Sequence, residues 1–191
     1  MTSVLKSEGL RKAFHMATVA VPVAVYWLPP SIWRWPLIGL ALLVTGVDLV
    51  RLGSPRIGTY FARMLGPYLR KHERHELTGS TYLTLACVLS ALVFPKAIAV
   101  AVMGYLILGD ALAGLVGKTW GRRPLFFGKT WEGTLAGLAA NLLVGALVFR
   151  SPEETLVGAF VASAVELLPF PLDDNFAIPV VTGVVLKLSF G

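Results

Sequence analysis

The stretch GDALAGLVGKTWGRRPLFFGKTWEG, from Gly109 to Gly133, joins two long apolar runs of the chain. It contains the tetrapeptide Gly-Lys-Thr-Trp twice, at 117–120 and 128–131, and the carboxylates Asp110 and Glu132 border these repeats. Lysines and glycine-rich backbone bind phosphate, and carboxylates bind metal ions. We therefore interpret this stretch as part of a phosphate and metal site at the end of membrane helices.

The composition predicts an integral membrane protein. Of the 191 residues, 55% are hydrophobic and only 15% are charged, and the mean hydropathy is +0.71. An ordinary soluble domain carries about 25% charged residues. The length fits one domain over 1–191. The single cysteine, Cys87, excludes a disulfide within the chain and a thiolate metal cluster.

The apolar runs predict the helices of this protein. Since about 20 apolar residues span a bilayer, we expect an all-α, polytopic fold with about seven transmembrane helices. Their expected ranges are 12–29, 33–50, 78–94, 96–116, 132–149, 154–169 and 175–190. The alternative is six spans with one short re-entrant segment. The first run lacks a small-residue cleavage site, so we expect a retained helix there rather than a signal peptide.

The basic residues predict the orientation. Thirteen of the 17 Lys and Arg residues fall within 1–12, 51–77 and 117–131. A cytoplasmic N-terminus places all three segments inside, as the positive-inside rule requires. The net charge of +6 is then explained without nucleic acid. We expect a cell-membrane protein with its active site on the cytoplasmic side, and an interfacial segment or a solvated loop over 60–70.

Carboxylates at the edge of a membrane are costly, which makes them candidates for function. In the expected topology the acidic residues at the cytoplasmic face are Asp48, Asp110, Glu132, Glu166, Asp173 and Asp174. The basic residues Lys118, Arg122, Arg123 and Lys129 fall at the same face. This convergence suits a nucleoside triphosphate with Mg²⁺, because carboxylates and phosphate oxygens share that metal while lysines neutralise the phosphates.

These residue types indicate roles within the cluster. We expect the metal ligands to be Asp110, Asp173 and Asp174, and the phosphate ligands to be Lys118 and Lys129. Arg122 and Arg123 either assist or only set the topology. His15 shares a helix face with Arg11, and it lies either in the site or buried in a helix.

Two other classes of protein fit the sequence poorly. A P-loop requires a glycine five residues before Gly-Lys-Thr, where the chain has Leu112 and Arg123. A small transporter or channel requires polar residues near the middle of the bilayer. The expected helices are apolar there, with Asn141 and a few threonines as exceptions.

Six short motifs follow one another along almost the whole chain: Arg11–His15, Asp48–Arg51, Glu76–Tyr82, Gly109–Gly121, Lys129–Gly133 and Asp174–Pro179. The ordered set resembles the family of phytol kinases, dolichol kinases and CTP-dependent diacylglycerol kinases, although no single motif is specific. The resemblance implies CTP as phosphoryl donor, Mg²⁺ as cofactor, and a membrane lipid alcohol of polyprenol, phytol or diacylglycerol type as acceptor.

The resemblance also implies functional residues. The implied catalytic residues are Asp110, Lys129, Glu132 and Asp174. The implied nucleotide-binding residues are Arg11, Lys12, His15, Asp48, Glu76, Thr78, Gly117, Lys118, Gly121, Arg122, Thr130 and Asn175. The alternative is nucleotidyl transfer to a lipid phosphate, as in the related phosphatidate cytidylyltransferases. Their closing motif contains a histidine, whereas this chain has none after His75, so we expect a kinase.

Overall fold

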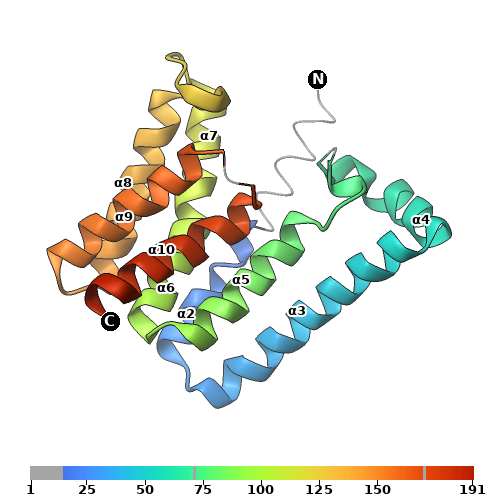
Figure 1. Cartoon of the computed structure of the whole chain (residues 1–191), viewed down its shortest axis with the longest axis horizontal. Coiled ribbons are helices and arrows are strands. Elements are labelled where there is room, and N and C mark those ends of the chain that lie inside the picture. Colours follow the sequence, from blue (N-terminus) through green and yellow to red (C-terminus); the bar gives the residue numbers. More distant parts are fainter. Residues whose placement is uncertain (1–14, 71, 170) are drawn as a thin grey trace.

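The structure is a computed structural model, which describes residues 15–70, 72–169 and 171–191 (Figure 1). The described residues are helical apart from turns, loops and one isolated β-bridge between Pro124 and Thr130. The elements are α2 (Ala20–Trp27), α3 (Pro30–Gly53), α4 (Pro55–Leu65), η1 (Gly66–Tyr68), η2 (His72–Arg74), α5 (Gly79–Val93), α6 (Lys96–Gly104), η3 (Tyr105–Asp110), α7 (Ala111–Trp120), η4 (Phe126–Gly128), α8 (Trp131–Val148), α9 (Pro152–Leu167) and α10 (Asp174–Phe190). The predicted all-α class is confirmed for this part of the chain.

In the part of the chain that the structure describes, three helices are long and apolar enough to cross a membrane. They cover Pro30–Gly53, Lys96–Trp120 and Trp131–Val148. The middle one combines α6, η3 and α7 in one continuous helix. Shorter apolar helices cover His15–Trp27 and Gly79–Val93. The count of seven spans and the cytoplasmic N-terminus stay predictions, because length and composition alone do not test them.

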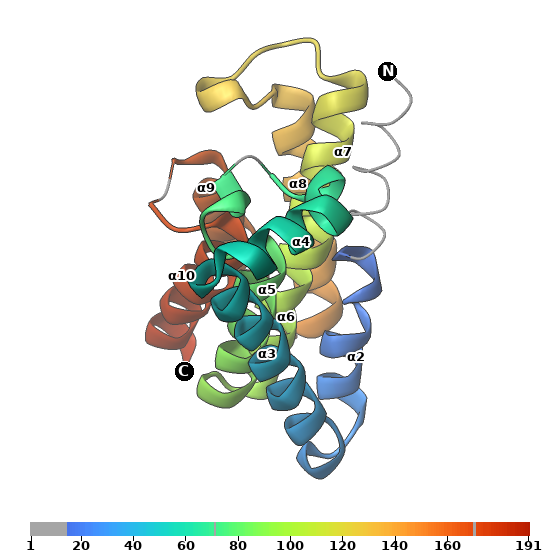
Figure 2. The same cartoon turned by 90° about the vertical axis from the view of Figure 1, so that its right-hand side faces the viewer.

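The centre of the bundle is the helix formed by α6 and η3. Nearly every residue from Ile98 to Ile107 is buried, because α2, α5, α8, α9 and α10 all pack against this helix. By contrast α3 lies at the edge of the molecule, where it contacts mainly α4 and α5 (Figure 1, Figure 2). Its leucines Leu42 and Leu43 are largely exposed. In a bilayer such a surface faces lipid.

Helix α4 differs from the other described α-helices because it buries none of its residues. It begins at Pro55, a favoured first residue of a helix, and it mixes aromatic and aliphatic side chains with Arg56 and Arg63. The segment expected at the membrane surface, 60–70, is therefore helical up to Leu65 and continues as η1. Contact between this helix and the membrane surface stays a prediction.

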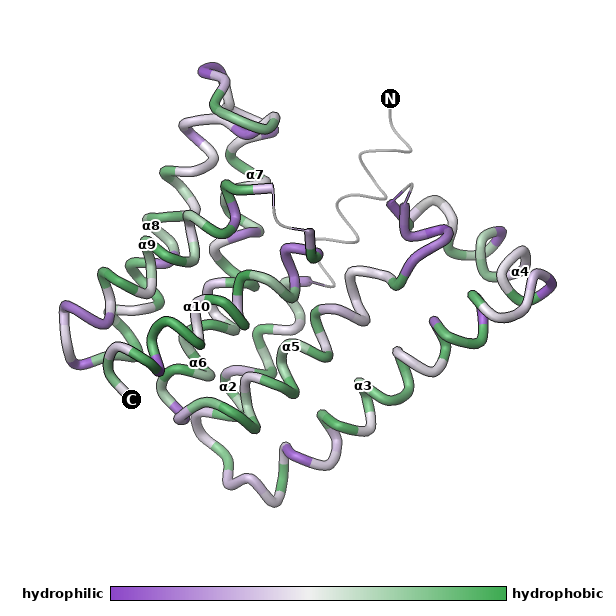
Figure 3. The backbone as a smooth tube through the Cα atoms, in the orientation of Figure 1, coloured by the Kyte–Doolittle hydropathy of each residue, from purple (hydrophilic) through white to green (hydrophobic). Residues whose placement is uncertain are grey.

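Three helices begin toward the same end of the bundle, and α5 and α10 begin side by side. Side chains cap each of them: Thr78 caps α5, Thr130 caps α8 and Asp173 caps α10. Strongly hydrophilic segments lie around these starts, as Figure 3 shows for the chain before α5 and before α10. Helix N-termini carry partial positive charge, so this end of the bundle is suited to anions.

Candidate functional site

Lys129 is the centre of the polar cluster between α8, α9 and α10. Its Nζ atom donates to Glu166 Oε1 at 2.7 Å and lies 3.9 Å from Asp174 Oδ2. Glu166, in the last turn of α9, is buried, whereas a third of the Lys129 side chain is exposed. The structure therefore brings together two predicted catalytic residues, Lys129 and Asp174. Glu166 was expected at the same face but without an assigned role.

The charge on Lys129 is stabilised by its surroundings. Burial alone would lower the pKa of Lys129. The charge of Glu166, the hydrogen bond to it, and the charges of Asp174 and Asp110 outweigh burial and raise the pKa above its ordinary value. Lys129 therefore stays protonated at neutral pH. Three carboxylates act on this one ammonium group, so the cluster has an excess of negative charge.

The start of α8 holds the loop that carries Lys129. Thr130 accepts from the Gly133 amide at 3.2 Å, and its side chain packs closely against Gly117 and Gly121 of the preceding segment. The carboxylate of Glu132 accepts from two backbone amides of the loop, at 3.1 and 3.3 Å. These predicted site residues therefore position the loop, and the glycines let α7 and α8 approach.

The remaining predicted residues of this loop are exposed. Lys118 lies in the last turn of α7, and Arg122 and Arg123 present their amides, not their guanidinium groups, to Glu132. The loop turns at Phe127 and Gly128, which have positive φ values of 55° and 76°. It projects beyond α9 and α10 (Figure 1, Figure 2). The side chains of Arg122 and Arg123 are exposed on this loop.

A second cluster joins the start of α10 to the loop before α5. Asp173 Oδ2 accepts from Arg70 Nη1 at 3.0 Å, and its Oδ1 accepts from the Asn175 amide at 2.9 Å. Glu73 accepts from the Arg70 amide at 2.6 Å and from the Gly79 amide at 2.8 Å. Asp173, predicted as a metal ligand, is therefore engaged at both oxygens. The buried Asn175 supports it with a second bond, from Nδ2 at 2.6 Å.

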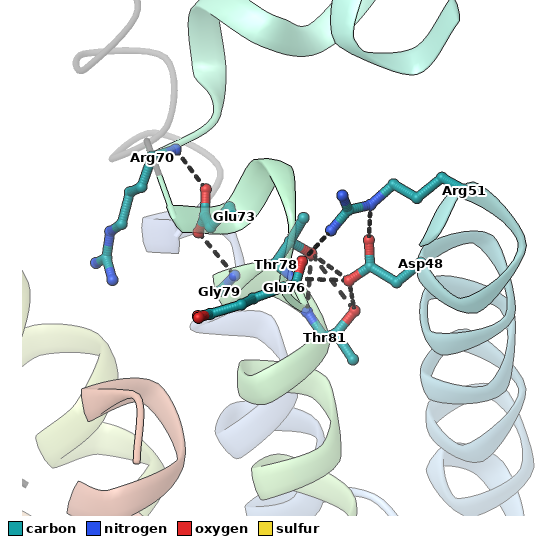
Figure 4. Close-up of polar contacts among 8 residues, drawn as sticks. All are labelled: Asp48, Arg51, Arg70, Glu73, Glu76, Thr78, Gly79 and Thr81. Carbon is teal, nitrogen blue, oxygen red and sulfur yellow. Dashed lines mark hydrogen bonds and ion pairs between the residues drawn. The ribbon is translucent and has the colours of Figure 1, made fainter. Parts of the chain in front are cut away.

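A third cluster surrounds Asp48 near the end of α3 (Figure 4). Its Oδ1 accepts from Arg51 Nε at 2.5 Å, and its Oδ2 accepts from the Thr78 amide, the Thr78 hydroxyl and the Thr81 hydroxyl at 2.7, 2.9 and 2.5 Å. Asp48 and Arg51 are both buried. Glu76 contributes its backbone carbonyl, which accepts from Arg51 Nη2. This arrangement holds α3 against the start of α5.

Asp110 ends the π-helical segment η3 and is partly buried. Its charge reaches Lys129, as the raised pKa of the lysine reflects. The neighbouring Gly109 touches Asn141 of α8 so closely that a β-carbon would overlap the amide oxygen. His15, another predicted site residue, hydrogen-bonds the Leu106 carbonyl of η3 at 3.2 Å. Arg11 and Lys12 lie outside the described residues.

Metal binding by protein side chains alone is not supported. Within 15–70, 72–169 and 171–191, no group of three or more His, Cys, Asp or Glu side chains is placed to hold a metal ion. Magnesium typically binds through one or two carboxylates together with substrate phosphates. Asp110 and Asp174 fit that mode, because contacts with the other described residues do not engage both oxygens of either carboxylate, as they do for Asp173.

Sequence reasoning left two residues without an assigned role. Glu166 binds Lys129, and Glu73 organises the loop before α5. The sequence signal for Glu166 is a carboxylate within an apolar run, but the sequence does not indicate which residue pairs with it. Glu73 gives a weaker signal, because it stands among basic residues of the segment 51–77. The positive-inside rule accounts for the charge of that segment without a functional role.

Comparison with known proteins defines the class to which this arrangement is related. The chain is a distant homologue of CTP-dependent lipid kinases along most of its length. It is 26% identical to CTP-dependent diacylglycerol kinase 1 of Eremothecium gossypii, over 95% of this chain and 67% of that protein. It is 26% identical to the Saccharomyces cerevisiae protein of the same name, over 96% of this chain and 74% of that protein. It is 29% identical to phytol kinase of Synechocystis sp., over 93% of this chain and 77% of that protein.

The resemblance to this group of kinases is thus confirmed as distant homology. No protein-family model matches the chain. No solved structure matches it significantly.

Proposed function

We propose that this protein transfers the γ-phosphoryl group of CTP to the hydroxyl of a membrane lipid alcohol at the cytoplasmic face. The observation that carries the proposal is the Lys129 cluster, where one ammonium group meets Glu166 and Asp174 within the field of Asp110. Phosphoryl transfer is catalysed mainly by positioning and charge stabilisation. The kinases similar to this chain supply the donor, CTP, and the acceptor class, lipid alcohols.

The charges of the cluster fit this reaction. Lys129 is held protonated by the surrounding carboxylates, so it is available to stabilise charge on the transferring phosphoryl group. Asp110 and Asp174 would hold Mg²⁺ together with phosphate oxygens, and the bound metal would neutralise phosphate charge. The capped N-termini of α8 and α10 present further positive potential at this end of the bundle.

The proposed reaction is a direct transfer of the phosphoryl group from CTP to the lipid hydroxyl. The lipid hydroxyl oxygen forms a bond to the γ-phosphorus, and the bond between that phosphorus and the β,γ-bridging oxygen breaks, which releases CDP. The hydroxyl proton passes to a carboxylate. Asp110 or Asp174 would accept this proton, since Glu166 is buried against Lys129. The exposed apolar surface of the helices would keep the acceptor chain in the bilayer, with its hydroxyl at the interface.

The test is a product assay on the purified protein in lipid nanodiscs. CTP or ATP labelled at the γ-position is supplied with a panel that contains diacylglycerol, phytol and a polyprenol. We expect label in one lipid alcohol, release of CDP, preference for CTP, and dependence on Mg²⁺. Pyrophosphate release with a lipid phosphate as acceptor would instead identify a cytidylyltransferase, and no transfer to any alcohol would refute the proposal.

A further inference from the structure

We infer that His15 is a positioning residue for Asp110 and that it acts through the π-helical segment η3. The role assigned to Asp110 rests on the proposed kinase function, but the structural coupling between His15 and η3 does not. The inferred role differs from the direct nucleotide contact expected for His15 from the sequence. It follows from four features of the residues around η3.

The first feature is the irregular pattern of backbone hydrogen bonds in η3. Tyr105–Asp110 forms a π-helical turn inside the long helix Lys96–Trp120. In such a turn the amide partner of the Leu106 carbonyl would be that of Ala111, five residues on. The Ala111 amide donates to the Leu108 carbonyl instead. The Leu106 carbonyl therefore lacks the donor that a π-helical ladder would give it, and a donor from a side chain stabilises such a buried carbonyl.

The second feature is the donor that meets this carbonyl. His15 Nε2 lies 3.2 Å from Leu106 O, although 91 residues separate the two in sequence. A carbonyl only accepts, so Nε2 must carry the proton. Leu106 itself is fully buried, and His15 is half-buried. A side chain from before α2 thus donates a hydrogen bond to the backbone of a π-helical turn at the centre of the bundle.

The third feature is the contact between η3 and α8. Gly109 lies against the amide oxygen of Asn141 without space for a β-carbon, and its carbonyl lies near Gly137. Asn141 is itself held, since its Nδ2 donates to Ser163 of α9 at 3.0 Å. The backbone of η3 is therefore fixed by His15 and by α8, immediately before Asp110.

The fourth feature is the geometry of the helix that follows. A π-helical turn adds one residue relative to an α-helix, and each α-helical residue turns the side-chain direction by about 100°. If η3 relaxed to a regular α-helix, Asp110 would turn by a similar angle relative to α6. The Asp110 carboxylate would then point in another direction relative to Lys129. Its charge now helps to raise the pKa of that lysine. The bond from His15 favours the π-helical register, and this register directs Asp110.

The experiment compares His15→Leu, which removes the donor, with His15→Gln, whose side-chain amide can still donate to the Leu106 carbonyl. We expect His15→Leu to lower kcat by about 10- to 100-fold, as a displaced catalytic group does, with KM for CTP changed by less than about twofold. We expect His15→Gln to recover most of the loss. The matched control is His72→Leu, which removes an exposed histidine and should leave both constants unchanged.

Amide hydrogen exchange provides a readout that does not depend on activity. We expect peptides covering 105–112 to exchange faster in His15→Leu than in the wild type or His15→Gln, while peptides from α9 stay unchanged. Equal exchange over 105–112 in all three proteins would overturn the inference. A raised KM for CTP at unchanged kcat would also overturn it, because it would identify His15 as a nucleotide ligand. If the wild type transfers no phosphate, the proposed function fails, but the exchange data still decide the role of His15.

Discussion

Lys129 Nζ and Glu166 Oε1 lie 2.7 Å apart and join the loop before α8 to the last turn of α9. The pair is asymmetric, because Glu166 is buried whereas a third of Lys129 is exposed. The lysine can therefore meet a ligand while its partner keeps it in place.

Replacing Lys129 by Met should remove the positive charge that the proposed reaction requires. We expect kcat to fall by about 10²- to 10³-fold, as for other lost electrostatic stabilisers. The free energy of unfolding should also fall, by about 1–3 kcal/mol, because Glu166 remains buried without a cation. The matched control is Lys187→Met in the last turn of α10, where the ammonium group donates to the Val93 carbonyl. Equal activity of the two variants would contradict the role of Lys129.

The pH dependence of stability follows from the raised pKa of Lys129. A raised pKa in the folded state stabilises the protein fully below the unfolded-state pKa, which is about 10.4 for lysine. This contribution is lost only as the pH rises through the folded-state value. We therefore expect the difference in unfolding midpoint between wild type and Lys129→Met to be constant from about pH 7 to 9. A difference that shrinks within that range would show that the lysine loses its proton there.

Asp110→Asn should separate catalysis from folding. The variant keeps the size and most hydrogen bonding of the side chain but removes its charge, so we expect kcat to fall by about 10³-fold with little change in thermal stability. Transfer rates and melting curves of the purified variant measure the two effects. Glu153→Gln, an exposed carboxylate in the first turn of α9, serves as the control. Near-normal transfer by Asp110→Asn would rule out a catalytic Asp110.

Asp48→Ala should destabilise the attachment of α3. The change leaves Arg51 buried without its carboxylate and removes three acceptor contacts to Thr78 and Thr81. Breaking a buried pair in this way costs about 3–5 kcal/mol. Denaturant unfolding in a mild detergent measures the loss, with the exposed Thr59→Ala of α4 as control. An unchanged midpoint for Asp48→Ala would mean that the network contributes nothing to folding.

Gly133→Ala tests the close approach of α7 and α8. A β-carbon at Gly133 would lie 2.7 Å from the Ala113 carbonyl oxygen and 2.9 Å from the Gly117 α-carbon. Backbone atoms cannot move aside cheaply, so we expect a loss of about 1–3 kcal/mol in the free energy of unfolding. Gly114→Ala is the matched control, because nothing lies within 4 Å of its β-carbon. We expect the control to be neutral or to gain up to about 1 kcal/mol, as alanine favours helix.

Much of the fold was predictable because apolar runs of helical length leave few alternatives. Each of the seven expected segments overlaps a helix, and the segment near Tyr60 is helical at the surface. The π-helical turn was not predictable, since 105–109 reads as apolar as the rest of its helix. Its cause is tertiary: the turn depends on contacts from His15 and Asn141.

The site was predictable as a set of residues at one face, but their partners were not. Lys129 and Asp174 meet as expected, whereas Asp48 and Asp173 are engaged in structural networks. The bond between Arg70 and Asp173 joins residues 103 positions apart. The distribution of charged residues along the sequence predicts the side of the membrane on which they lie. Which of them form ion pairs depends on how the helices pack.

The pairing of Asp48 with Arg51 has a consequence for biosynthesis. Both residues lie on α3, three positions apart, so the helix carries the neutralising partner of its own buried charge. The ribosome delivers α3 before Thr78 and Thr81 of the following helix exist as partners. A helix that enters the bilayer with a lone carboxylate pays a large penalty, and a self-contained ion pair reduces it. The carboxylate buried on α3 therefore has its cation before any later helix is synthesised.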